Sequence, residues 1–120
     1  MFRDHIQGLV DRLREDGGLA GLLMGFDGVA VESYQRPGLG TELQEMAVEL
    51  AHLLSQVRRT RLGARGGLLK ELVVRTDRLA VVLEVVNESY FLAVALLPTA
   101  NVGKARYVLR ATVPAIRAEM

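Results

Sequence analysis

The spacing of hydrophobic residues along the chain predicts three helices. Near the N-terminus, apolar residues recur every three or four positions between charged ones, and Gly17-Gly18 ends this helix. A second helix begins at Thr41, where Gln44 completes a capping box, and a third follows Asn101, which can cap it. Apolar residues cover so wide an arc of the second helix that we expect it to contact two surfaces. These residues are Leu43, Met46, Ala47, Leu50, Ala51, Leu53, Leu54 and Val57.

Five shorter apolar runs predict strands. Runs 19–26 and 29–34 flank Asp27-Gly28, which predicts a tight hairpin whose two central residues both have positive φ. Run 69–76 mixes apolar residues with Lys70, Glu71 and Arg75, as is typical of an edge strand. Runs 79–86 and 90–97 are apolar at almost every position, so we expect both their faces to be covered.

The order of these elements predicts the fold class. The chain reads α-β-β-α-β-β-β-α without a linker or a repeat, so we expect one domain over residues 1–120. An α/β (α+β) sandwich follows, with one five-stranded, antiparallel-rich sheet and helices on both faces.

The amino-acid composition indicates that the folded chain has a large apolar surface to bury. Hydrophobic residues make up 50% of the 120 residues; with glycine counted in place of tyrosine the share is about 58%, against about 45–50% in typical domains. The longest apolar run, 90–97, is far shorter than the roughly 20 residues that a membrane helix needs. The surplus is therefore expected in a core or against another chain.

Charge and cysteine content exclude several classes of function. Fifteen basic and fourteen acidic residues nearly cancel, so no overall field attracts nucleic acid or an acidic membrane. The chain has no cysteine, which excludes disulfides and thiolate chemistry and fits a reducing compartment. Residues 1–7 lead into no signal-like apolar segment. We therefore expect a cytoplasmic protein that neither inserts into membranes nor binds nucleic acid.

Two glycine-containing strings fail as phosphate-binding loops. Gly103-Lys104 resembles the end of a P-loop, but Pro98 occupies the first glycine position and Ala105 replaces the required Ser or Thr. Gly38-x-Gly40 has Leu43 at its third glycine position.

No other residues predict catalysis. Neither His5 nor His52 has partners at a spacing typical of a metal site, and no serine lies in a nucleophile motif. The expectation is a non-enzymatic protein without catalytic residues, metal or cofactor.

One local charge cluster stands out at the end of the second helix, formed by Arg58, Arg59, Arg61 and Arg65. Cations near a helix C-terminus are stabilising, which is one interpretation. The other is a docking surface for an acidic partner, because guanidinium groups pair with carboxylates in a bidentate manner.

Several strings in this order resemble the Roadblock/LC7 family over almost the whole chain. They are the hairpin at 25–32, the long second helix, the two central strands and the segment 101–106. The chain is most similar to stand-alone bacterial members of the MglB and MglC type.

The resemblance implies a homodimer and a partner. The sheets would join edge to edge through the third strand, with the second helices packed together. The interface residues assigned on this basis are Leu43, Met46, Ala47, Leu50, Leu54, Leu72 and Val74. The implied partner is a Ras-like small GTPase or a complex that regulates one, often in cell polarity and motility.

Three hypotheses for the function remain. The first is a homodimeric regulator or scaffold of a small GTPase module. The second is an adaptor that binds a sister Roadblock protein or an acidic, response-regulator-like partner through the four arginines. The third, ranked lower, is a small-molecule sensor or enzyme with a pocket between sheet and helix.

Overall fold

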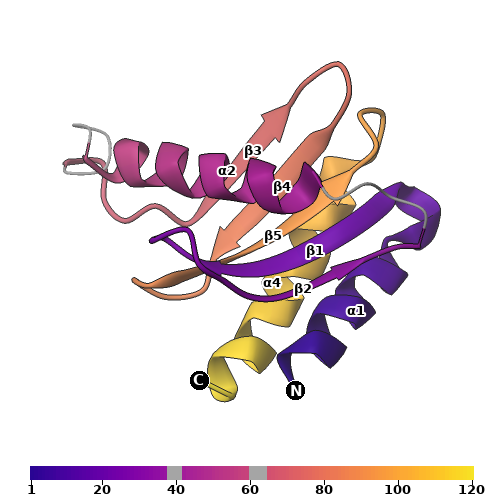
Figure 1. Cartoon of the computed structure of the whole chain (residues 1–120), viewed down its shortest axis with the longest axis horizontal. Coiled ribbons are helices and arrows are strands. Elements are labelled where there is room, and N and C mark those ends of the chain that lie inside the picture. Colours follow the sequence, from indigo (N-terminus) through magenta and orange to yellow (C-terminus); the bar gives the residue numbers. More distant parts are fainter. Residues whose placement is uncertain (38–41, 60–64) are drawn as a thin grey trace.

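The computed structural model describes residues 1–37, 42–59 and 65–120, without the side chains of 42–44. The described residues form three α-helices, one 3₁₀ turn and a five-stranded sheet, and Figure 1 shows that the sheet is twisted. The elements in chain order are α1 (Phe2–Arg12), a 3₁₀ turn (Arg14–Asp16), β1 (Gly18–Gly25), β2 (Ala30–Gln35), α2 (Glu42–Arg59), β3 (Glu71–Arg75), β4 (Ala80–Val85), β5 (Tyr90–Leu96) and α4 (Val102–Ala118).

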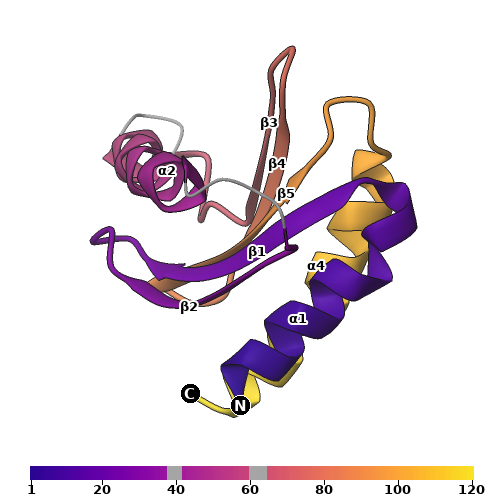
Figure 2. The same ribbon diagram turned by 45° about the vertical axis from the view of Figure 1, so that its right-hand side comes forward.

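The sheet has the strand order β2-β1-β5-β4-β3, and every neighbouring pair is antiparallel. This confirms the predicted fold class. Helices α1 and α4 cover one face, and α2 lies over the other (Figure 2).

The central strand β5 supplies both halves of the core, because successive side chains point to opposite faces. Leu92, Val94 and Leu96 pack under α1 and α4. Phe91 and Ala93 pack on the other face, under α2. The prediction that both faces of this strand are covered is confirmed.

The hairpin at Asp27-Gly28 is confirmed, but its predicted turn type is wrong. The Gly28 N–H donates to Gly25 O at 3.0 Å, and the Gly25 N–H donates to Val29 O at 2.9 Å. Gly28 has φ +89°, whereas no described residue other than glycine has positive φ. The loop therefore has three residues, with the left-handed position at Gly28 only.

A polar side chain caps the start of α4. The Asn101 side chain accepts hydrogen bonds from the Gly103 N–H at 3.0 Å and the Lys104 N–H at 3.3 Å, which confirms the predicted cap. This capped turn also accounts for the glycine-lysine string that resembles a P-loop. The predicted capping box at Thr41 and Gln44 lies outside what the structure describes, as does Gly38-x-Gly40.

Candidate functional site

β3 lies at one edge of the sheet, as its mixed sequence predicted. Leu72 packs against the core on the α2 face, and Val74 borders a groove on that same face. Val73, on the opposite face, remains 39% exposed. An open edge presents unpaired backbone groups that another strand can bind.

An apolar groove of about 380 Å³ separates α2 from the neighbouring part of the sheet. Its lining residues are Ala20, Leu22, Met46, Ala47, Glu49, Leu50, Leu53, Val74, Thr76, Leu79, Val81, Ala93, Val94 and Ala95. Only Glu49 and Thr76 among these carry polar side chains, so the groove offers few groups that could orient a polar ligand. It favours contact with another apolar surface.

The residues assigned to a dimer interface divide between this groove and the core. Met46, Leu50 and Val74 line the groove, and Leu72 is half-buried on the same face. The side chain of Leu43 lies outside the described part of the chain.

Ala47 and Leu54 have a different position. Both side chains are buried under α2 in the core cluster that contains Phe91, and Leu54 has an exposed fraction of 0%. Leu54 leaves a partner chain no surface to contact, and Ala47 lines the groove but is only 3% exposed, so we omit both from the interface proposed below. Leu53, which sequence reasoning did not assign to the interface, is 42% exposed and lines the groove.

The described arginines of the cluster at the end of α2 are all exposed, and Arg58 also contacts the fold. The Arg58 guanidinium lies 4.2 Å from the centroid of the Phe26 ring, and its Nη1 donates to Glu88 O at 3.2 Å. Arg58 therefore ties α2 to the two loops beneath it. Arg59 and Arg65 are exposed, whereas Arg61 lies outside the described residues.

A second charged cluster, which the sequence did not reveal, lies between β3, β4 and α4. The register places Glu71 directly opposite Glu84. Arg106 forms an ion pair with Glu71. Arg110 Nη2 lies 3.6 Å from Glu71 Oε2, and Arg110 Nε lies 3.3 Å from Glu84 Oε1. That last contact is an ion pair without hydrogen-bond geometry, since Glu84 Oε1 has no hydrogen-bond partner among the described residues.

The pKa values of the two carboxyl groups of this cluster are shifted in opposite directions. Burial, then the hydrogen bond and charge of Glu71, raises the pKa of Glu84 from 4.5 to about 7. Burial also acts to raise the pKa of Glu71, but the hydrogen bond from Glu84 and the guanidinium groups outweigh it and lower that pKa. The pair therefore shares a proton, which resides on Glu84, its 6% exposed member.

We expect the parent chain to lose stability as the pH rises, and we expect the Glu84→Gln variant not to show this loss. The folded chain holds the Glu84 proton up to about pH 7, whereas the unfolded chain releases it near pH 4.5. The contribution of Glu84 is thus complete below the lower value and lost as pH rises through the higher one. Between pH 5 and 8, the free energy of unfolding of the parent chain should fall relative to that of the variant by up to about 3 kcal/mol.

Urea unfolding at several pH values measures this difference. The control is Glu88→Gln, at an exposed position, whose curve should parallel that of the parent chain. Parallel curves for Glu84→Gln as well would contradict a shared, buried proton.

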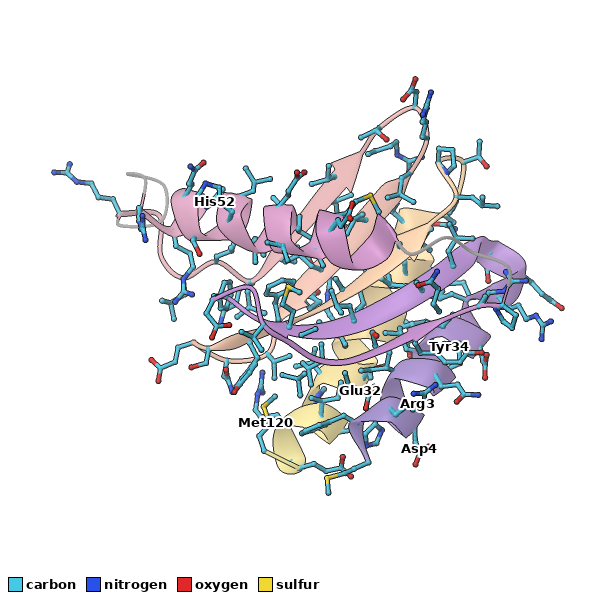
Figure 3. The ribbon with its side chains drawn as sticks, viewed as in Figure 1. Arg3, Asp4, Glu32, Tyr34, His52 and Met120 are labelled. Atoms are coloured by element: carbon cyan, nitrogen blue, oxygen red, sulfur yellow. The ribbon has the colours of Figure 1, made fainter. Side chains whose placement is uncertain are left out.

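The two histidines have other partners. His5 Nε2 lies 3.2 Å from Glu119 Oε2, a contact between residues near the two ends of the chain. His52 lies on the outer side of α2 (Figure 3) and contacts Gln56 at 3.2 Å. Among the described residues, no group of three or more His, Cys, Asp or Glu could hold a metal ion. The described helices also include none that is long and apolar enough to cross a bilayer.

Comparison with solved structures finds close matches to the whole fold. MglC from Myxococcus xanthus is 38% identical, with a TM-score of 0.72, over 99% of this chain and 98% of that chain. A Roadblock/LC7 domain from Streptomyces avermitilis is 22% identical, with a TM-score of 0.79, over 98% and 95% of the two chains. The gliding protein MglB from Thermus thermophilus is 18% identical, with a TM-score of 0.79, over 97% and 88%. Neither a family model nor a curated protein matches the sequence.

Proposed function

Because the chain belongs to the Roadblock/LC7 family, we propose that it is a non-enzymatic, homodimeric regulator or scaffold of a Ras-like small GTPase module of the polarity and motility type. The observation that carries this proposal is the 38% identity to MglC over nearly the full length of both chains. The proposed location is the cytoplasm.

The surface formed by α2 and β3 supports the homodimer. An apolar groove borders the open edge of the sheet, and Met46 and Leu53 remain exposed along it. A second copy placed against this surface extends the sheet and covers the apolar side chains in one step. A two-fold contact of this kind is self-complementary, as most homodimers are.

Two groups of charged residues hold elements of the fold together. Glu71, Glu84, Arg106 and Arg110 form an ion-pair network between helix and sheet. Arg58 is held against Phe26. These pairings connect elements of the fold, so we assign the partner-binding role to the exposed surface around α2.

We expect this protein to change GTP turnover by the Ras-like GTPase of its own organism. A change of about tenfold corresponds to about 1.4 kcal/mol in the activation barrier. Turnover is measured by phosphate release with and without the protein, and complex formation by co-purification. A variant that is monomeric should lose the effect. If neither turnover nor co-purification changes, the GTPase module is the wrong partner.

The adaptor hypothesis is the second candidate, supported by the exposed arginines at and beyond the end of α2. Here the chain binds a sister Roadblock protein or an acidic adaptor without touching the GTPase. Arg58 is exposed as well but is held against Phe26, so we propose Arg59 and Arg65 for that contact. Capture of the sister chain with unchanged GTP turnover favours this hypothesis. Loss of capture in Arg59→Glu/Arg65→Glu then locates the contact, and unchanged capture excludes the arginines.

A further inference from the structure

Two hollows adjoin on the α4 side of the sheet. The larger has a volume of about 460 Å³ and lies between α4 and strands β3 and β4. The smaller has a volume of about 160 Å³ and lies between the end of α2, the chain that leads into β3 and the β4–β5 turn. Lys70, Val85 and Arg117 line both hollows, so the two are continuous. None of their lining residues belongs to the apolar groove beside α2.

Positive charge predominates around the two hollows, although the charges of the whole chain nearly cancel. The cationic residues that line them, which we call the basic track, are Arg58, Lys70, Arg106, Arg110 and Arg117. The carboxyl groups that line them belong to Glu71, Glu84 and Glu88. The cations outnumber the carboxylates even when all three are ionised. A concave surface with an excess of one sign of charge attracts ligands of the opposite sign.

The arginines of the basic track keep donors for a ligand. A guanidinium group has five N–H donors. Arg117 donates from Nε and Nη2 to the Val86 carbonyl, at 3.0 and 2.9 Å. Arg110 contacts Glu71 and Glu84, yet its side chain remains 59% exposed. The contacts within the fold therefore fix these groups in place and leave further N–H donors, which suits paired hydrogen bonds to carboxylates.

Two hydrogen-bond acceptors lie beside the larger hollow. Glu84, which lines it, is 6% exposed, and its Oε1 atom has no hydrogen-bond partner among the described residues. Arg110 and Pro114 also line it. Pro114 has no N–H, so the Arg110 carbonyl lacks the donor that a helix normally supplies four residues later. A peptide backbone carries N–H donors, and acidic side chains on the same peptide would pair with the neighbouring cations.

The smaller hollow adds an apolar contact. Leu68 lines it and is 84% exposed, next to the half-buried Leu69. The length of the track also fits an extended peptide. Arg106 and Arg117 are eleven residues apart on α4, which is about 16 Å along a helix. About five residues of extended chain cover this distance.

We propose that the basic track binds an extended acidic segment of a partner protein, with carboxylates on Lys70, Arg110 and Arg117 and one apolar side chain against Leu68. This contact is independent of the homodimer and of the GTPase module. It lies on the face of the sheet that α4 covers and at the adjoining end of the sheet, whereas the apolar groove lies on the face that α2 covers (Figure 2). One chain could therefore hold a second copy and an acidic segment at the same time.

Fluorescence anisotropy with a labelled peptide tests this proposal. The probe has one leucine followed by seven glutamates, and the control peptide has glutamine in place of every glutamate. The parent chain should bind the probe, and not the control, at physiological salt concentration. Lys70→Glu and Arg117→Glu should each raise the dissociation constant by about tenfold or more, because each replaces an attraction by a repulsion. Arg78→Glu makes the same change of charge at an exposed position outside the track and should change binding little.

The apolar contact is tested separately from the charges. Leu68→Ser should weaken binding of the leucine-containing probe by about fivefold, because less apolar surface then leaves water. The same variant should bind a peptide of eight glutamates as tightly as the parent chain does. Attraction of negative charge to the protein as a whole would not produce this difference between the two peptides.

Every other outcome overturns the proposal. No binding of the probe excludes the site, and equal weakening by Lys70→Glu and Arg78→Glu shows attraction to the overall charge only. Loss of binding in Arg59→Glu/Arg65→Glu, with unchanged binding in Lys70→Glu, places the acidic contact at the end of α2. Circular dichroism checks that each variant is folded. If Arg117→Glu fails to fold because it loses the contact with Val86, Lys70→Glu decides, since Lys70 is exposed.

Discussion

We expect Leu54→Ala to lower the free energy of unfolding by about 2–5 kcal/mol. Leu54 has an exposed fraction of 0% and belongs to the core cluster under α2, with Leu22, Met24 and Phe91. Truncation removes the buried side-chain atoms and leaves a cavity that rigid neighbours fill only in part. Because marginally stable domains have only about 5–15 kcal/mol in total, this change is a large part of the stability.

The neighbouring residue provides the matched control for this experiment. Leu53 is 42% exposed, so Leu53→Ala removes the same atoms from the same helix with a much smaller loss of buried contact. Urea denaturation of the two variants and the parent chain measures both effects. Equal destabilisation by the two substitutions would show that α2 does not pack on the sheet through Leu54.

Leu53→Asp should have the largest effect on self-association and little effect on the fold. In the proposed dimer, the side chain at this position is covered by the second copy, and an unpaired charge buried there costs several kcal/mol. We expect the dissociation constant to rise by about 100-fold or more, which corresponds to about 2.7 kcal/mol. In the monomer the aspartate remains in contact with water, so thermal unfolding should change little.

Val48→Asp is the control for the interface. Val48 is also exposed on α2, at 51%, but it lies beside Gly28 at the β1–β2 turn and does not line the groove. Light scattering over a range of concentrations measures self-association of the parent chain, the Leu53→Asp variant and the Val48→Asp variant. A dimer that survives Leu53→Asp but dissociates with Val48→Asp would place the interface on the other side of α2.

Strand positions followed directly from the sequence. Runs 79–86 and 90–97 are apolar at almost every residue, and β4 and β5 are interior strands of the sheet. Charged residues among apolar ones marked β3, which lies at the edge. These inferences succeeded because a strand that is buried on both faces requires apolar residues at almost every position, whereas a strand at the edge is partly exposed to water and tolerates charged residues. The residue types along a strand therefore indicate how far it is buried.

The division of α2 into a core side and a groove side could not be predicted in the same way. Leu53 and Leu54 are adjacent and chemically identical, and a wide apolar arc assigns both to buried positions. Only the packing of α2 on the sheet shows that Leu54 is covered and Leu53 is not. The pairing of Glu71 with Glu84 could not be predicted from the sequence for a related reason. It depends on the register of two strands and on an arginine pair that lies on α4, far along the chain from both carboxylates.

The central position of β5 has a consequence for synthesis on the ribosome. The hairpins β1–β2 and β3–β4 are each local in sequence, but they are joined into one sheet by β5, which pairs with β1 on one side and β4 on the other. Until Tyr90–Leu96 leaves the exit tunnel, the nascent chain holds two separate hairpins, and isolated two-stranded hairpins are marginally stable in water. Folding of the core therefore waits for the last quarter of the chain. During that interval, the apolar faces of both hairpins are exposed to chaperones and to other nascent chains.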